Sequence, residues 1–112
     1  MSYYAHEEEM DMSYHLGDQQ RKFTLMTAKL IEFAYANGYE LTYGDAYATT
    51  GHKHMSLHYV RLAVDFNLFK DGEYLTDGKD HAFLHDYWDT LGGSERIEGD
   101  MNHYSLAYAG RR

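Results

Sequence analysis

The stretch LAVDFNLF at residues 62–69 carries the clearest secondary-structure pattern in the chain. Apolar residues alternate there with small or polar ones, which is the period of a strand with one buried face. The residues expected to face the core are Leu62, Val64, Phe66 and Leu68. We therefore predict a strand over residues 60–69 that turns Ala63, Asp65 and Asn67 towards a cleft.

The chain after this strand predicts a hairpin, a helix and a last strand. Asp71-Gly72 is a strong turn signal, and residues 73–75 can form the return strand. Residues 80–91 read as an amphipathic helix that ends at Gly92-Gly93. Its apolar face is expected to hold Leu84, Tyr87, Trp88 and Leu91. Residues 102–108 then read as a strand.

The chain before the strand predicts a long helix followed by a short strand. Residues 19–37 have apolar residues at helical spacing, with Asp18 as the N-cap and Asn37-Gly38 as the stop. Residues 39–44 resemble a short strand, and a loop runs from residue 44 to 56. This pattern predicts an α+β fold, a small antiparallel sheet with flanking helices. We expect an acidic N-terminal arm at residues 1–17 and one domain at residues 18–112.

Composition excludes several classes of protein. The 112 residues suit one domain, with 44% hydrophobic and 25% charged residues. A net charge of -8 argues against nucleic-acid binding. The absence of cysteine excludes a thiolate metal site. No stretch is long and apolar enough to insert into a membrane, and residues 1–17 do not resemble a secretory signal, so we expect synthesis in a cytoplasm.

Three residues in this pattern suit a transition metal. His58 precedes the central strand, Asp65 lies on its small-residue face, and His103 begins the last strand beside Ser105. Two histidines and a carboxylate suit Zn²⁺ and leave a fourth position for water, which is typical of catalytic zinc. Hydrolysis also needs a general base. A turn at Gly99 would bring Asp100 inward for that role.

These residues resemble a known family. Ser56, His58, Ala63 and Asp65 match the motif Ser-x-His-x-x-Gly-x-Ala-x-Asp of the zinc D-alanyl-D-alanine carboxypeptidase and L-alanyl-D-glutamate endopeptidase family. Residues 99–103 are similar to its second motif, an acidic residue three positions before the last zinc-binding histidine. The resemblance covers about residues 20–108. The family includes phage endolysins and shares its fold with the hedgehog signalling domain.

The resemblance implies a fold, a reaction and a setting. The fold would be of the hedgehog/DD-peptidase type, with His58, Asp65 and His103 holding Zn²⁺ and Asp100 as the general base. The substrate would be the peptidoglycan stem peptide, cut at an L-alanyl-D-glutamate or a D-alanyl-D-alanine bond. We expect a monomeric endolysin, made in the cytoplasm of a host bacterium and reaching the periplasm or cell wall by holin-type release.

Two positions depart from the family pattern. Arg61 stands where the motif has glycine, and Ala48 stands where members usually carry an arginine. Because the resemblance gives that arginine a role in holding substrate or developing charge, Ala48 is expected to weaken or abolish activity. Arg61 would substitute for it only if strand alternation turned Arg61 to the cleft. Ser56 and Ser105 are expected to hydrogen-bond the metal ligands.

Other interpretations compete with the peptidase. A non-catalytic module of the same fold would keep zinc and use the cleft for wall binding or as a structural part of a virion, and Ala48 favours it. A metal-sensing or storage protein would bind more than one ion through the extra histidines. Among these, His52 and His54 are expected to be exposed or to line the cleft. His81 and His85 are expected on a solvated helix face, and Trp88 in the core.

Overall fold

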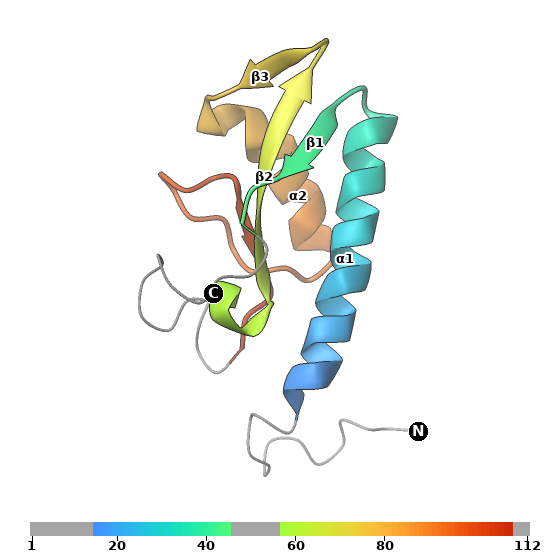
Figure 1. The fold of residues 1–112 in the computed structure, drawn as a ribbon, viewed down its shortest axis with the longest axis vertical. Coiled ribbons are helices and arrows are strands. Elements are labelled where there is room, and N and C mark those ends of the chain that lie inside the picture. Colours follow the sequence, from blue (N-terminus) through green and yellow to red (C-terminus); the bar gives the residue numbers. More distant parts are fainter. Residues whose placement is uncertain (1–14, 46–56, 109–112) are drawn as a thin grey trace.

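The strand expected from residues 62–69 forms the centre of the sheet. The computed structural model describes residues 15–45 and 57–108. Its strands are β1 (Glu40–Tyr43), β2 (Ala63–Lys70), β3 (Glu73–Leu75) and β4 (His103–Ser105). β2 pairs antiparallel with each of the others, so the prediction of an α+β fold with an antiparallel sheet is confirmed (Figure 1).

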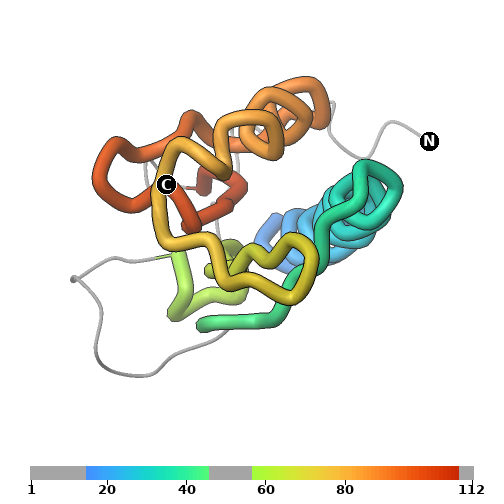
Figure 2. Tube along the Cα trace, turned by 90° about the horizontal axis from the view of Figure 1, so that it is seen from above, coloured from blue at the N-terminus to red at the C-terminus, as the bar shows by residue number. Residues whose placement is uncertain are grey.

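The two helices cover the same face of the sheet (Figure 2). α1 spans Leu16–Ala36 and α2 spans Ala82–Thr90. The predicted N-cap of the first helix was wrong. The helix begins at Leu16, earlier than expected, so Asp18 lies within its first turn and pairs with Arg21 instead. The predicted stop is confirmed, because Gly38 takes a φ of 85° just after the helix ends.

Short 3-10 helices change two of the predicted boundaries. Residues Leu57–Val60 form η3, so β2 begins at Ala63 and not at residue 60. Residues Gly78–His81 form η4, where the Asp77 carboxylate accepts a hydrogen bond from the backbone N–H of Lys79 at 3.0 Å. This side-chain cap starts the turn that leads into α2.

The β2–β3 hairpin turns where the sequence predicts. Asp71 and Gly72 have φ values of 52° and 79°. Positive φ at both central residues is the mark of a type I′ turn, whose twist matches that of the flanking strands. The turn fixes the register that pairs Lys70 with Glu73.

The core lies between the sheet and the helices. The apolar residues of β2 face it as predicted, and Trp88 of α2 is fully buried against them. The Trp88 ring meets Phe23 edge-on at 5.8 Å and Tyr104 edge-on at 5.9 Å. The buried hydrophobic residues are Phe23, Met26, Leu30, Ala34, Leu57, Leu62, Ala63, Val64, Phe66, Leu68, Leu84, Trp88, Tyr104, Leu106 and Tyr108.

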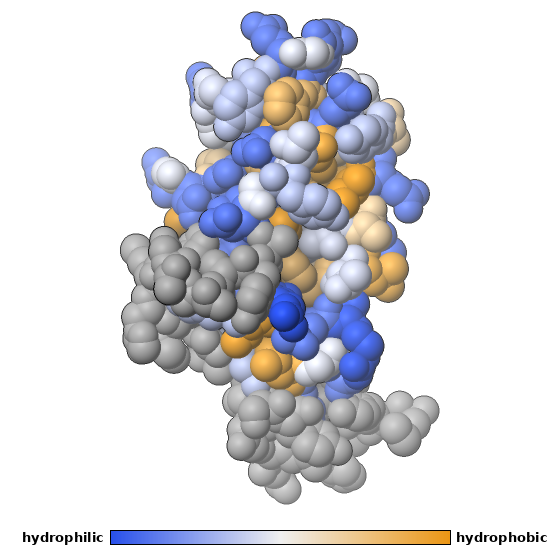
Figure 3. Space-filling model, viewed as in Figure 1, coloured by the Kyte–Doolittle hydropathy of each residue, from blue (hydrophilic) through white to orange (hydrophobic). Residues whose placement is uncertain are grey.

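Two further findings concern the surface and the helices of the described residues. On the face shown in Figure 3, apolar areas are small and are separated by hydrophilic residues. Neither α1 nor α2 combines the length and the apolar character that crossing a bilayer requires. Most of the predicted acidic arm, residues 1–14, lies outside the described part of the chain, while residues 16 and 17 belong to α1.

Candidate metal centre

The three predicted metal ligands come together from three separate elements. His58 belongs to η3, Asp65 to the middle of β2, and His103 to the start of β4. Among the described residues, the possible ligand atoms of these three side chains lie close enough together to hold a metal ion. The fold therefore brings together the three residues that the sequence interpretation grouped, in an arrangement that could hold a metal ion.

Strand pairing explains why Asp65 and His103 meet. The two residues are direct cross-strand partners in the β2–β4 ladder. The neighbouring residue Phe66 donates its N–H to the carbonyl of Asn102 at 2.9 Å, so Asp65 and His103 form a non-hydrogen-bonded pair. Side chains approach most closely in such pairs. The register alone thus sets the carboxylate beside the imidazole.

The backbone of Asp65 is held from the other edge of β2. Its N–H donates to the carbonyl of Asp45 at 2.6 Å, and its carbonyl accepts from Gly44 at 2.7 Å. A Cβ atom at Gly44 would lie 3.2 Å from both the Cβ and the carbonyl oxygen of Asp65. The absence of a side chain at Gly44 therefore allows this close approach. Asp65 is held between β4 and the segment that follows β1.

The donor atoms form a nearly equilateral triangle. His58 Nε2 lies 3.3 Å from Asp65 Oδ1 and 3.2 Å from His103 Nδ1. His103 Nδ1 lies 3.4 Å from the same carboxylate oxygen. In a tetrahedral site with zinc bonds of about 2.0–2.1 Å, any two ligand atoms lie about 3.3–3.4 Å apart. The triangle has the dimensions of one face of a zinc tetrahedron.

Hydrogen bonds among the three side chains do not account for this triangle. If both imidazoles donate to Asp65, both ring nitrogens carry a hydrogen, and the 3.2 Å contact between these nitrogens has no acceptor. If one imidazole nitrogen accepts a hydrogen bond from the other, the accepting nitrogen carries no hydrogen and cannot donate to Asp65. Asp65 Oδ1 is buried, and its contacts with the two histidines, at 3.3 and 3.4 Å, are longer than good hydrogen bonds. A cation among three lone pairs satisfies all three atoms together.

Electrostatics favour an ionised carboxylate in this cluster. Burial raises the pKa of Asp65, but the hydrogen bonding and charge of His103 and His58 outweigh burial and hold that pKa well below its usual range. Asp65 is 20% exposed, whereas His58 is 2% and His103 7% exposed. Asp65 is thus the most exposed of the three side chains, and a fourth ligand would enter from its side.

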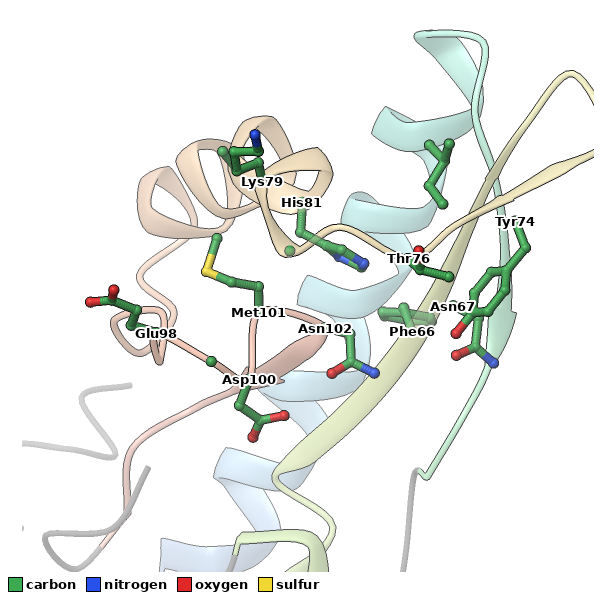
Figure 4. A pocket seen from close by; sticks show the side chains of 14 residues that line it. Phe66, Asn67, Tyr74, Thr76, Lys79, His81, Glu98, Asp100, Met101 and Asn102 are labelled. Carbon is green, nitrogen blue, oxygen red and sulfur yellow. The ribbon is translucent and has the colours of Figure 1, made fainter.

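Asp100, the predicted general base, lies in the turn just before β4. The turn forms where the sequence expects it, with Gly99 at a φ of 83°. The N–H of Asp100 donates to Ile97, and its carbonyl accepts from the N–H of His103 at 3.1 Å. The carboxylate is exposed. Asp100 is one of the residues that line a pocket beside β2, and Figure 4 shows its carboxylate pointing away from the centre of that pocket. Its catalytic role stays a prediction.

Arg61 differs from its predicted setting. It lies in the turn between η3 and β2, not on a strand, so strand alternation does not orient it. Its φ is 58°, in the left-handed region that favours glycine. The resemblance placed a glycine at this position, and the backbone conformation gives a physical reason for one.

The remaining predicted site residues divide into two groups. Ser105 is buried, and its backbone carbonyl accepts hydrogen bonds from Trp88 Nε1 at 3.0 Å and from the N–H of Ser94 at 2.8 Å. Its hydrogen bonding to the ligands stays a prediction. Ala48 and Ser56 lie outside the described residues, as do two further histidines, His52 and His54.

The expectation that His81 and His85 face solvent was wrong. Their side chains are 4% and 0% exposed. The segment leading into β4 covers this face of α2, and His85 Nε2 lies 2.7 Å from the carbonyl of Met101. His81 Nδ1 lies 2.6 Å from the hydroxyl of Tyr104. The residues that bury the pair are 16 and 23 positions away in sequence, so helical periodicity did not reveal them.

The second cluster is uncharged near neutral pH. Burial, helped by the neighbouring His85, lowers the pKa of His81 to about 4, against the opposing effect of Asp80. Burial also lowers the pKa of His85, although the hydrogen bond to Met101 raises it. Burial raises the pKa of Tyr104, which stacks on His85 with ring centroids 4.3 Å apart.

Comparison with known proteins adds no family assignment. No protein-family model, no curated protein and no solved structure matches the chain. The function is therefore inferred from the site itself. The chain has an α+β fold with a buried His-Asp-His group that is able to bind a metal ion.

Proposed function

We propose that this protein is a zinc-dependent peptidase that hydrolyses an amide bond in the peptidoglycan stem peptide. The triangle of His58 Nε2, Asp65 Oδ1 and His103 Nδ1 carries the proposal. Three protein ligands that include two imidazoles and one carboxylate, with solvent access at one side, are typical of hydrolytic zinc. The choice of substrate rests on the resemblance of the two motifs.

Each residue has a part in the proposed reaction. When bound, zinc supplies the Lewis acidity that amide hydrolysis requires. His58 and His103 would hold the ion as neutral imidazoles, and Asp65 would offset part of its charge. Asp100 would accept a proton from the attacking water and return it to the leaving amine. The carbonyl of Asp100 accepts a hydrogen bond from the N–H of His103, so the proposed base is connected to the strand that carries a proposed metal ligand.

The proposed setting is lysis of a host bacterium by a phage or prophage. The chain would be made in the host cytoplasm and reach the cell wall by holin-type release. Both the L-alanyl-D-glutamate and the D-alanyl-D-alanine bond are candidate targets. We propose that a single copy of the chain suffices, because all three ligands come from one chain.

Release of free amino groups from purified peptidoglycan tests this function. The zinc-loaded protein should release amines, a chelator should stop the release, and mass spectrometry of the fragments should identify the bond. Asp100→Asn should keep one zinc per chain and lose activity by about 10²–10⁴-fold, the usual contribution of a general base. Full activity in Asp100→Asn would remove that residue from the mechanism.

A non-catalytic wall-binding module is the second candidate, and Ala48 favours it. Loss of an electrostatic clamp on developing charge costs about 10²–10³ in rate. A binding module would sediment with wall material and release no amines. If Ala48→Arg then produced amine release, the missing arginine would be the reason for inactivity. Binding of several zinc ions per chain would instead support a storage or sensing role.

A further inference from the structure

A pocket of about 680 Å³ lies beside the metal centre, along the edge of β2. β4 pairs with β2 as far as Asp65, and the next hydrogen bond joins Phe66 to Asn102. β3 pairs with the same strand from Leu68 onward. Asn67 therefore stands at the gap between β3 and β4, and the pocket occupies this gap.

The pocket is one or two peptide residues away from the metal ligands. Asn67 lines it and lies on the same face of β2 as Asp65, two positions along the strand. Two strand residues span about 7 Å. An extended peptide with a carbonyl at the metal centre would therefore enter the pocket within about two residues of the scissile bond.

His81 projects into this pocket although little of its surface is exposed. The residue is 4% exposed, yet it is part of the pocket lining. Figure 4 shows its imidazole pointing into the cavity, between Thr76 and Met101 and above Phe66 and Asn102. A buried polar group directed into a cavity is a candidate for ligand recognition.

The hydrogen bond with Tyr104 fixes the tautomer of His81. The Tyr104 side chain is fully buried, so its hydroxyl hydrogen needs an acceptor. Within the described residues that acceptor is His81 Nδ1, at 2.6 Å. A ring nitrogen that accepts carries no hydrogen, so the hydrogen of the neutral imidazole is on Nε2. His81 thus offers an N–H donor to the pocket.

We propose that this pocket binds the part of the peptide next to the scissile bond, and that His81 Nε2–H donates to one of its carbonyl or carboxylate oxygens. The proposal rests on the proposed function, because it takes the substrate to be a peptide. His81 is a positioning residue here. It holds the substrate chain while the reacting bond lies at His58, Asp65 and His103.

The pocket lining suits a short peptide with polar and apolar parts. Phe66, Leu75 and Met101 supply apolar wall, and Asn67 and Asn102 supply amide groups. Lys79 and Glu98 bring opposite charges to the rim. A lining of mixed charge and amides matches peptide backbone and carboxylate groups better than a uniformly charged polymer.

His81→Asn tests the donor. The asparagine Oδ1 lies close to the place of Nδ1 and can still accept from Tyr104, while the Nε2 donor is removed. A synthetic pentapeptide that contains both candidate bonds should show a KM or dissociation constant raised by about 5- to 20-fold, as for one lost hydrogen bond. The kcat and the zinc affinity should change little. His81→Gln, whose amide reaches towards the Nε2 position, should recover part of the loss.

His85→Gln is the matched control. It alters an equally buried histidine four residues further along the chain, in α2, and the new amide keeps a donor for the Met101 carbonyl. His85 does not line the pocket, so its variant should bind the peptide as the parent does. An equal loss in both variants would reduce His81 to a packing role and overturn the proposal. So would ¹⁵N imidazole shifts that place the hydrogen of His81 on Nδ1.

The experiment separates this inference from the proposed function. If the peptide binds and His81→Asn weakens binding but no amide is cut, the pocket assignment stands and the peptidase does not. If the peptide is cut and His81→Asn has parental KM, the peptidase stands and the pocket assignment falls. If the pentapeptide neither binds nor reacts, both fall.

Discussion

Two histidine clusters lie on opposite faces of β4 and show what distinguishes a cluster that could hold a metal ion. His103 and Tyr104 are neighbours in sequence and point to opposite sides of the strand. His103 joins His58 and Asp65 on one side, whereas Tyr104 joins His81 and His85 on the other. All four histidines are buried to a similar degree.

Partner chemistry, not burial, separates the two clusters. In the first, two imidazole nitrogens and a carboxylate oxygen converge and no arrangement of hydrogens suits all three contacts. In the second, His81 meets a hydroxyl and His85 meets a backbone carbonyl, and one neutral tautomer of each satisfies the contact. The first cluster has the geometry that could hold a cation, whereas the contacts of the second are those of ordinary hydrogen bonds.

Zinc binding should give the largest difference between the clusters. Free Zn²⁺ at about 1,000 times its dissociation constant should stabilise the parent protein by about 4 kcal/mol. His103→Ala removes one ligand and should abolish most of this stabilisation. His85→Gln, in the other cluster, should keep it. Chemical denaturation of each protein with zinc and with chelator measures the effect, and equal stabilisation of His103→Ala would exclude the predicted site.

Acid should destabilise the metal-free protein mainly through the second cluster. The pKa of His81 falls from 6.5 to about 4 on folding, so the unfolded chain binds the proton more tightly. Stability is therefore full above pH 6.5 and falls as the pH drops to about 4, by about 3 kcal/mol from this residue. His85 acts with the same sign. Asp65, with its lowered pKa, contributes only below its ordinary value of 3.8.

Urea unfolding at pH 7, 5.5 and 4 in the presence of chelator measures this pH dependence. His81→Asn has no titrating group at this position and should show a clearly smaller loss of stability between pH 6.5 and 4. A loss as large as that of the parent would show that other groups cause the acid sensitivity.

Gly93→Ala should disturb both clusters together, because it displaces the Trp88 side chain that hydrogen-bonds to β4, the strand that they share. A Cβ atom at Gly93 would lie 2.0 Å from Trp88 Nε1, which donates to the carbonyl of Ser105 in β4. Overpacking of this kind costs about 2 kcal/mol. Thermal unfolding and zinc titration should both show a loss. Gly92→Ala is the control: its Cβ meets open space, so only the strain of a φ of 90° remains.

The sequence predicted the elements from local spacing, and it grouped His58, Asp65 and His103 from two motifs that the fold brings together. The alternation around Asp65 predicted the central strand, its buried face and the face that carries the Asp65 side chain. The Asp71-Gly72 turn fixed the hairpin in the same way. The second cluster was missed because the burial of His81 and His85 depends on a segment far along the chain, which no local pattern encodes.

The predicted start of β2 was wrong for a related reason. The predicted strand began at residue 60, but Val60 completes a 3-10 helix and Arg61 adopts a left-handed conformation before the strand starts. Periodicity of side chains carries no information about the sign of φ. A glycine at position 61 would have signalled the turn, whereas an arginine concealed it.

Arg61→Gly should therefore give the smallest effect, and a stabilising one relative to Arg61→Ala. A residue with a Cβ atom pays about 1–2 kcal/mol for a left-handed conformation, and glycine does not. Both variants lose the arginine side chain, so their difference isolates the backbone cost at the entry to β2. Equilibrium unfolding should find Arg61→Gly more stable than Arg61→Ala by about 1 kcal/mol. Equal stabilities would mean that the turn relaxes when the arginine is removed, and that this residue itself maintains the conformation between His58 and Asp65.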